Sequence, residues 1–328
     1  MDFTNEPPKL MVLFYGVVAF LAVVGLVLFL LDKAPLRRDR WVALIFLLPA
    51  GILLSIGLII PAIRTFILSF TAPNAADPRN DKWVGLDNYV WMFTSPEARE
   101  ALLNTLLWVI LVPAVSTMVG LVYSVVVDRA RAESFSKSLM FMPMAISFVG
   151  AGIIWRFIYE YRPTEESQLG LLNQFVVWFG GTPQQWLLNP PWNTLFLIVV
   201  LIWIQAGFAM VVLSAAIKAI PTEITEAARL DGVTAWQMFW RVTVPSVRPA
   251  LLVVFVTITI GTLKVFDIVR AMTGGQFGTS VLAYDMFNWA FVFGNQGHGT
   301  ALAVFLFLLV TPIVIYQIYN LRQQREIR

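Results

Sequence analysis

Long apolar runs with few charges dominate the sequence. A helix needs about 20 apolar residues to cross the hydrocarbon core of a membrane, and seven runs of this kind can be distinguished. Because lipid offers no hydrogen-bond partners to the backbone, each run predicts a transmembrane helix. We therefore predict an all-α fold, a polytopic membrane helical bundle of about seven transmembrane helices. The runs lie at 10–31, 41–70, 101–127, 138–159, 193–217, 250–270 and 300–319.

The composition agrees with a membrane protein and argues against several other classes. Only 13% of the 328 residues are charged and the mean hydropathy is +0.74, whereas a soluble domain carries about 25% charged residues. The absence of cysteine excludes disulfides and thiolate metal sites. We interpret the single histidine, His298, as a loop residue and expect no metal site, because a metal usually recruits several protein donors. The basic residues form short clusters, so nucleic acid is not an expected partner.

Basic clusters predict the orientation in the membrane, because cytoplasmic loops are enriched in Lys and Arg. They place the N-terminus outside, the C-terminus in the cytoplasm and residues 218–248 on the cytoplasmic side. We interpret 1–40 as a retained N-terminal anchor helix with a cytoplasmic linker, and 41–328 as the main transmembrane domain. The clusters consist of Lys33, Arg37, Arg38, Arg40, Arg129, Arg131, Lys137, Arg322, Arg325 and Arg328.

The extracytoplasmic loop at 160–192 has an apolar middle that is too short to span a membrane. We expect it to lie along the membrane surface, where Trp178, Trp186 and Trp192 would fit the aromatic belt. Arg156, near the outer end of the fourth run, is expected to extend its charge toward the interface.

A charged insert lies between the fifth and sixth runs, from Ile220 to Pro249. Pro221 suits a helix start, and Asp231-Gly232 offers a C-terminal stop. Thr234 then begins a second helix, with Gln237 as its capping-box partner. We predict two short helices joined at Gly232, the second of which ends at Pro245.

The second predicted helix gathers Trp236, Phe239 and Trp240 on one side. The charges of the insert make burial in lipid too costly. An exposed aromatic face of this kind indicates a docking surface. The alternative is that the helix packs onto the ends of its own spans.

The spacing within the insert resembles the signature loop of bacterial ABC importer permeases, E-A-A-x3-G-x9-I-x-L-P. The match runs from Glu226 to Pro245, with valines where the pattern has isoleucine and leucine. In that family the loop forms coupling helices that sit in a cleft of a cytoplasmic ATPase subunit. The resemblance implies coupling roles for Glu226, Ala227, Ala228, Asp231, Gly232 and Pro245.

The resemblance covers 41–328 and is greatest to carbohydrate-uptake permeases of the maltose and alpha-glucoside type. It also rests on LGLLNQF…WLLNPP, on WIQAGFAMVVLSAAIKAIP and on VFDIVRAMTGGQFGTSVLAYDMFNWAF, where Gln276 stands at the usual proline of a Gly-Gly-Pro turn. It implies ATP-driven import of a sugar such as maltose, trehalose or sucrose across the inner membrane by alternating access. The implied partners are a second homologous permease, two cytoplasmic ATPase subunits and an extracytoplasmic sugar-binding protein.

No Walker pattern occurs in the sequence. We therefore expect this chain to be no enzyme and to hold no cofactor, with ATP and Mg²⁺ bound by the partner ATPase. Gly274-Gly275 is interpreted as a turn rather than a phosphate cradle.

A sugar path needs polar and aromatic side chains that face the bundle interior. The fifth and sixth runs offer such faces, and Gln205, Phe208 and Thr262 match positions that the maltose permease uses. The alternative is that Thr259 and Thr262 hold helices together and that Lys264, Asp267 and Arg270 form a charge ladder. The candidate path residues are Trp203, Gln205, Phe208, Thr259, Thr262, Lys264 and Asp267.

Two other functional classes stay open on the sequence alone. Charges in the sixth run would suit an ion-coupled secondary transporter, and exposed cytoplasmic helices would suit a membrane scaffold without transport activity. The secondary transporter gives the E-A-A spacing no role, whereas the scaffold would use the same helices for docking and predicts that Phe208 and Thr262 are freely replaceable.

Overall fold

The computed structural model describes residues 39–73, 81–128 and 132–326, together with scattered positions between 11 and 29. The chain divides into two compact units, Met1–Ile67 and Leu68–Arg328. Most of the first predicted span, 10–31, and most of the basic residues at 33–38, 129, 131 and 328 lie outside the described residues. The predicted boundary between 40 and 41 stays a prediction.

From Asp39 onward the first unit is one apolar helical stretch. It consists of α2 (Asp39–Leu54), the π-helical turn η2 (Ser55–Ile59) and the start of α3 (Ile60–Leu68). The irregular turn comes directly before Pro61, whose ring clashes with the carbonyl four residues earlier and which has no N–H to donate. The predicted second span is therefore helical, with an irregular turn that ends two residues before Pro61.

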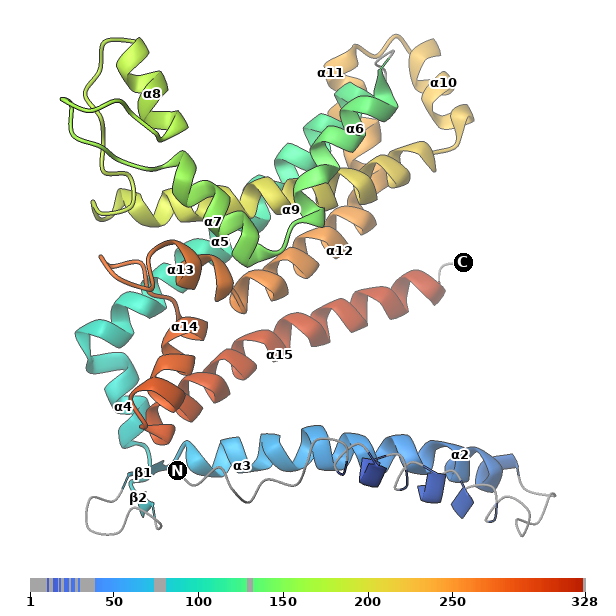
Figure 1. Cartoon of the computed structure of the whole chain (residues 1–328). Coiled ribbons are helices and arrows are strands. Elements are labelled where there is room, and N and C mark those ends of the chain that lie inside the picture. Colours follow the sequence, from blue (N-terminus) through green and yellow to red (C-terminus); the bar gives the residue numbers. More distant parts are fainter. Residues whose placement is uncertain are drawn as a thin grey trace. The chain divides into compact units, whose positions relative to one another are not determined.

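The second unit is almost entirely helical, as Figure 1 shows. The one strand pair among its described residues is a short antiparallel ribbon, β1 (Thr71–Ala72) with β2 (Lys82–Trp83), in which Thr71 pairs with Trp83. The helical elements are α4 (Asp87–Thr94), α5 (Pro96–Val127), α6 (Glu133–Phe141), η3 (Met142–Ala145), α7 (Phe148–Ile158), α8 (Leu171–Trp178), α9 (Trp192–Lys218), α10 (Thr222–Leu230), α11 (Ala235–Gln237), η4 (Met238–Thr243), α12 (Val244–Leu263), α13 (Asp267–Met272), α14 (Leu282–Phe287), η5 (Asn288–Val292) and α15 (Gln296–Glu326).

Within the described residues, five helices are long and apolar enough to cross a membrane, and a bent pair makes a sixth candidate. This confirms the all-α prediction and the second, third, fifth and seventh predicted spans. The five helices are Leu47–Leu68, Pro96–Val127, Trp192–Lys218, Ala235–Leu263 and Gln296–Asn320.

The prediction of one continuous helix over 138–159 was wrong. The segments Glu133–Ala145 and Phe148–Ile158 meet at an angle of 104°. Pro143 lies in the connecting 3-10 turn η3, where it cannot continue an α-helix. Ser147 then caps a new helix by accepting a hydrogen bond from the Gly150 amide.

The sixth predicted span was misplaced at both ends. The helix begins at Ala235 instead of 250 and ends at Leu263 instead of 270. After Leu263 the chain makes tight turns, in which the Lys264 amide donates to Gly261 and the Val265 amide to Thr262. A separate short helix, α13, begins at Asp267.

The core of the second unit is formed by α5, α9 and α12 with α13. Helices α5 and α9 pack closely at Gly120, where an added Cβ would lie 2.5 Å from the Ala209 Cβ. Small residues at such contacts let membrane helices approach, since lipid provides no hydrophobic drive between them. Buried side chains that line this core include Trp108, Val112, Leu197, Ile198, Leu201, Val254, Ile258, Ile268 and Met272.

Candidate functional site

The first helix of the cytoplasmic insert, α10, has the predicted ends. It follows Pro221, has Glu223 in its first turn and stops at Asp231. Gly232 adopts a left-handed φ of 72°, and the Val233 amide donates to the Ala228 carbonyl while the Gly232 amide donates to the Arg229 carbonyl. This is the hydrogen-bond pattern of a Schellman motif, which favours glycine at the left-handed position.

The second helix of the insert begins as predicted but does not end at Pro245. Thr234 and Gln237 form both hydrogen bonds of the capping box. The helix then passes through the π-helical turn η4 and continues as α12. Since the proline ring clashes with the carbonyl four residues earlier, the wider π turn before Pro245 lets the chain pass without ending the helix. The insert is therefore continuous with a membrane-spanning helix.

The residues matched to the coupling signature lie on the surface. Glu226, Ala227, Asp231, Gly232 and Pro245 are exposed, and Ala228 is half-buried. No ion pair to Glu226 occurs among the described residues. The signature residues are thus free to meet a partner.

An apolar surface accompanies the signature residues. The rings of Trp236, Phe239 and Trp240 contact one another, with centroids 4.9 to 6.4 Å apart, which confirms their predicted clustering. Trp236 is 72% exposed and Leu230, at the end of α10, is 89% exposed. Sequence reasoning missed Leu230, although a leucine beside the Asp-Gly stop was visible as a candidate.

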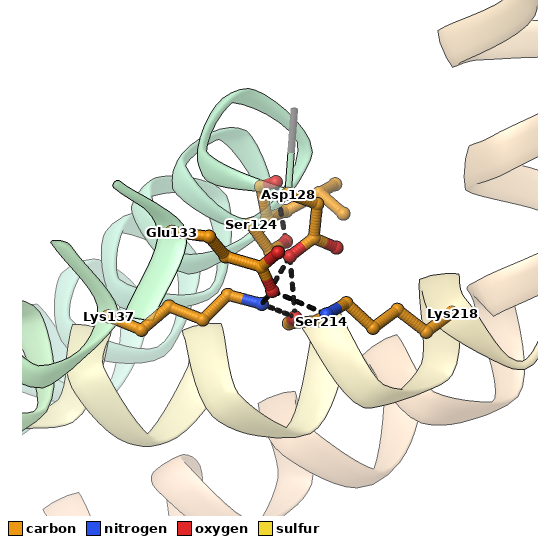
Figure 2. A network of polar contacts seen from close by, with 7 residues as sticks. Ser124, Asp128, Glu133, Lys137, Ser214 and Lys218 are labelled. Atoms are coloured by element: carbon orange, nitrogen blue, oxygen red, sulfur yellow. Dashed lines mark hydrogen bonds and ion pairs between the residues drawn. The ribbon is translucent and has the colours of Figure 1, made fainter. Parts of the chain in front are cut away.

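A charged network, shown in Figure 2, joins the base of the insert to its neighbours. Lys137 of α6 pairs with Asp128 at the end of α5 and with Glu133, 2.7 Å away. Lys218, the last residue of α9, also pairs with Glu133, and the Ser214 hydroxyl donates to Asp128 over 2.8 Å. Sequence reasoning used Lys137 and Lys218 only as topology markers. The network ties α5, α6 and α9 together just before α10 begins.

The candidate path residues of α9 face neighbouring helices. Trp203 is half-buried and packs edge-on against Trp155 of α7, with ring centroids 5.6 Å apart. The Gln205 side-chain nitrogen lies 3.7 Å from where a Cβ on Gly261 of α12 would be. Phe208 is half-buried against the main core. The structure thus brings Gln205 close to the sixth membrane helix, as the path hypothesis requires.

The two candidate threonines of α12 are buried. The Thr259 hydroxyl donates to the Phe255 carbonyl over 2.7 Å, and the Thr262 hydroxyl donates to the Ile258 carbonyl over 2.8 Å. Thr262 has no exposed surface. In this conformation both donors are used within the helix, while the oxygen lone pairs stay able to accept a further hydrogen bond. A role in the sugar path stays a prediction.

The charge ladder of Lys264, Asp267 and Arg270, which was the alternative to a path role, does not form among the described residues. Within the described residues no ion pair involves any of the three, and the Arg270 guanidinium lies over the rings of Phe266 and Phe287, 5.6 and 5.1 Å from their centroids. A spacing of three residues brings side chains together only on one continuous helix. The helix ends at Leu263, so the spacing argument fails for Lys264.

His298 is not a loop residue, as the sequence had suggested, but lies in the first turns of α15. Its ring stacks on the Trp91 ring, with the two ring centroids 3.7 Å apart, and contacts the Trp289 ring edge-on. Among the described residues no group of three or more potential metal-ligating side chains occurs. The histidine therefore packs between tryptophans.

Comparison with known proteins agrees with these features. Residues 102–328 match the family described as binding-protein-dependent transport system inner membrane component. The chain is 48% identical to an alpha-glucoside transport system permease of Rhizobium meliloti over 84% of this chain and 81% of that protein. It is 46% identical to an osmoprotective compounds uptake permease of Synechocystis over 86% of this chain and all of that one.

A solved structure has the same fold. A subunit of a bacterial ABC transporter involved in import of the polysaccharide alginate superimposes with a TM-score of 0.72, covering 86% of this chain and 96% of its own, at 24% identity. The family match covers more than half of this chain and includes the whole insert, α9, α12 and all but the first six residues of α5. The chain is therefore a member of the binding-protein-dependent transport system inner membrane component family.

Proposed function

We propose that this chain is a permease subunit of an ATP-driven importer that moves an alpha-glucoside or related small sugar into the cytoplasm. The observation that carries the proposal is the exposed insert 221–245, whose signature residues surround a Schellman turn and an aromatic surface. The names of relatives support a sugar as the transported substrate. Besides the alpha-glucoside permease, a trehalose/maltose permease of Thermococcus litoralis is 27% identical over 88% of this chain.

The mechanism follows from how the insert is attached. It leaves α9 at Lys218 and enters α12 through η4 without a flexible linker. A movement of the insert, when ATP closes two partner ATPase subunits, would therefore be transmitted to two of the three core helices. Alternating access then consists of those helices exposing the sugar path first to one side and then to the other.

The implied partners supply what this chain lacks. ATP and Mg²⁺ would bind to cytoplasmic ATPase subunits, and this chain would hold no cofactor. One insert in a chain engages one ATPase subunit, so a second homologous permease would engage the other. The family name itself implies a binding protein, which would deliver the sugar from outside. The orientation, with the N-terminus outside and the C-terminus in the cytoplasm, rests on the basic clusters.

The sugar path is proposed to run between α9 and α12. Gln205 beside Gly261 supplies polar donors and acceptors at that interface, and Phe208 and Trp203 supply aromatic surface. Thr259 and Thr262 supply acceptor oxygens on the facing helix. Lys264 is exposed just beyond the end of α12 and Asp267 is half-buried, so both would act near the mouth of the path.

Reconstituted vesicles test the proposal. Vesicles that contain this chain, its partner permease, the ATPase and the sugar-binding protein should accumulate maltose, trehalose or sucrose only when ATP is supplied on the ATPase side. Dissipating ion gradients with an ionophore should leave the rate unchanged. Uptake driven by an ion gradient without the ATPase would contradict the proposal. Binding of the same sugars to the isolated binding protein would identify the preferred substrate.

A further inference from the structure

We propose a second sugar-binding site at the extracytoplasmic end of the second unit, separate from the path between α9 and α12. The inference rests on the proposed sugar-uptake function and adds a place where the sugar first meets this chain. The site lies beside the N-terminus of α9. Because α9 is 27 residues long, it is about 40 Å from the insert at the other end of that helix.

The site is a cavity of about 560 Å³, within the range of pockets that hold small ligands. It is formed by the end of α7, the chain that follows it, the segment 185–188 and the end of α13 with the loop after it. Helices α7 and α13 lie side by side (Figure 1). The side chains that matter here are Arg156, Glu160, Tyr161, Gln185, Trp186 and Phe277.

One wall of the cavity is held by Asn173, which has no exposed surface. Its amide group donates to the Glu160 and Gln184 carbonyls over 2.9 and 3.0 Å. Its oxygen accepts hydrogen bonds from the Gln184 amide and from the Trp186 indole, both over 2.9 Å. All four hydrogen bonds fix Trp186 and the chain around it in place. The aromatic wall is therefore preformed.

Another part of the lining carries Phe277 in a strained conformation. Its φ of 57° makes it the one non-glycine residue with positive φ among the described residues, a conformation that a Cβ disfavours. Asn193, fully buried, donates to the Phe277 carbonyl over 2.6 Å. Phe277 is nevertheless half exposed at the cavity. A strained aromatic residue that packs poorly is a sign of a functional position.

The loop that carries Phe277 is rigid. Asn104 of α5 donates to the carbonyls of Gly278 and Ser280 over 2.8 and 2.9 Å. The buried Thr279 hydroxyl bonds with Thr273 at 2.6 Å. The Gly-Gly turn before Phe277 has φ values of 61° and 68°, which confirms its interpretation as a turn. Hydrogen bonds from α5 and α9 thus hold the backbone of the strained residue in place.

The chemistry of the cavity fits a sugar. Trp186, Tyr161 and Phe277 provide aromatic faces for the C–H side of a pyranose ring, and Gln185, Glu160 and Arg156 provide donors and acceptors for hydroxyl groups. Within the described residues no ion pair occupies Arg156 or Glu160. With Arg270, which also lines the cavity, two guanidiniums, one carboxylate and a neutral amide offer donors and acceptors to a ligand with many hydroxyls.

Protection of an introduced thiol tests the site directly, because the native chain has no cysteine. In the complete transporter in vesicles, Gln185→Cys is labelled with a small thiol reagent from outside, and labelling is read on this chain. Maltose, trehalose and sucrose are added one at a time without the binding protein. At a concentration ten times the dissociation constant, a bound sugar should slow labelling about tenfold. Tyr161→Cys provides a second position if Gln185→Cys does not assemble.

The matched control is Phe179→Cys, a 90% exposed position in the same outer loop that does not line the cavity. Its labelling should not respond to sugar. The double variant Gln185→Cys/Phe277→Asn lacks the phenyl ring but keeps a residue that tolerates left-handed φ at position 277. In this variant sugar should no longer protect the thiol at position 185. Protection that persists without the ring would overturn the assignment of Phe277.

The outcomes separate this proposal from the proposed function. If the wild-type vesicles take up sugar but no sugar protects either introduced thiol, the second site is wrong and the uptake function stands. If the binding protein without sugar protects the thiol and sugar alone does not, the cavity is a protein-docking seat and the proposal is overturned. If wild-type vesicles take up no sugar with ATP, the proposed function itself fails.

Discussion

Gly232 shows how one residue can control the insert. Its φ of 72° is left-handed, and no atom lies within 4 Å of where a Cβ would be, so strain rather than a clash decides the effect of substitution. Gly232→Ala should cost about 1 kcal/mol in the turn, and Gly232→Asn less. We expect the alanine variant to transport less sugar per ATP hydrolysed than the asparagine variant, as measured by uptake and hydrolysis in the same vesicles. Equal coupling ratios in both variants and the wild type would contradict a role for the turn.

Glu226 permits a test of docking without a change in the fold. Its carboxylate is exposed and has no ion pair among the described residues, so Glu226→Lys should leave the melting temperature of the chain unchanged. We expect it to weaken ATPase binding and to abolish sugar-stimulated hydrolysis. Glu223→Lys, which makes the same charge change at an exposed position one turn earlier, is the control and should keep most of the stimulation. Normal stimulation in Glu226→Lys would refute the coupling assignment.

The π turn η4 and Pro245 form one device that joins the insert to α12. Pro245→Ala restores a backbone N–H and removes the ring, so the helix can become regular from Ala235 onward. We expect equal or higher thermal stability but a lower ratio of transport to hydrolysis, because the helix would point in a new direction. Pro249→Ala is the control, since that proline lies in the same helix without a π turn directly before it. Unchanged coupling in Pro245→Ala would show that the π turn has no mechanical role.

The charged network at the base of the insert contains two lysines, one mostly buried and one exposed. Lys137 and its partner Asp128 are 21% and 11% exposed, whereas Lys218 is 54% exposed. Asp128 Oδ2 is buried without a partner in the described structure, so Lys137→Met would leave this carboxylate poorly compensated, at a cost of about 1–3 kcal/mol. Lys218→Met should cost less than about 1 kcal/mol. Melting temperatures in detergent should therefore fall clearly for Lys137→Met and little for Lys218→Met, and the reverse order would contradict the network described here.

A structural feature could be predicted from the sequence when the residues that determine it are neighbours in the chain. The ends of α10 and the capping box of Thr234 follow from neighbouring residues, and both were predicted. The bend at Pro143 and the end of α12 at Leu263 were not, because apolar residues continue on both sides of each break. Hydropathy predicts whether a segment is long and apolar enough to cross the membrane. It does not predict whether the segment is one unbroken helix. The spacing argument for Lys264 and Asp267 failed for that reason.

Contacts between segments that lie far apart in the chain could not be predicted from the sequence. Asn104, Asn173 and Asn193 each hold a loop through hydrogen bonds to backbone carbonyls, and an asparagine in a polar loop or a helix end carries no signal of this. The strained Phe277 was likewise invisible, although the Gly-Gly turn before it was recognised. The family resemblance placed the insert and the path helices, but the cavity needed coordinates.

On the scale of the whole molecule, the proposed function places the aromatic surface of the insert and the exposed end of α8 on opposite sides of the membrane. The aromatic surface of the insert and the exposed end of α8 lie near opposite ends of α9, a helix long enough to span the bilayer. A transporter of this kind must receive the sugar at one end and the ATPase at the other. Helix α9, which runs most of the way between them, is unbroken and can transmit movement.

This placement predicts opposite accessibility of two introduced thiols, and the cysteine-free chain provides the background. In sealed vesicles of known orientation, a reagent that cannot cross the membrane should label Phe179→Cys only from the extracytoplasmic side and Trp236→Cys only from the cytoplasmic side. Both positions are exposed, at 90% and 72%, so neither should fail for lack of access. Adding the ATPase should protect Trp236→Cys and leave Phe179→Cys unchanged, because only the insert is expected to enter the ATPase cleft. Labelling of both thiols from one side would invalidate the topology, whereas opposite labelling without protection by the ATPase would invalidate the docking surface alone.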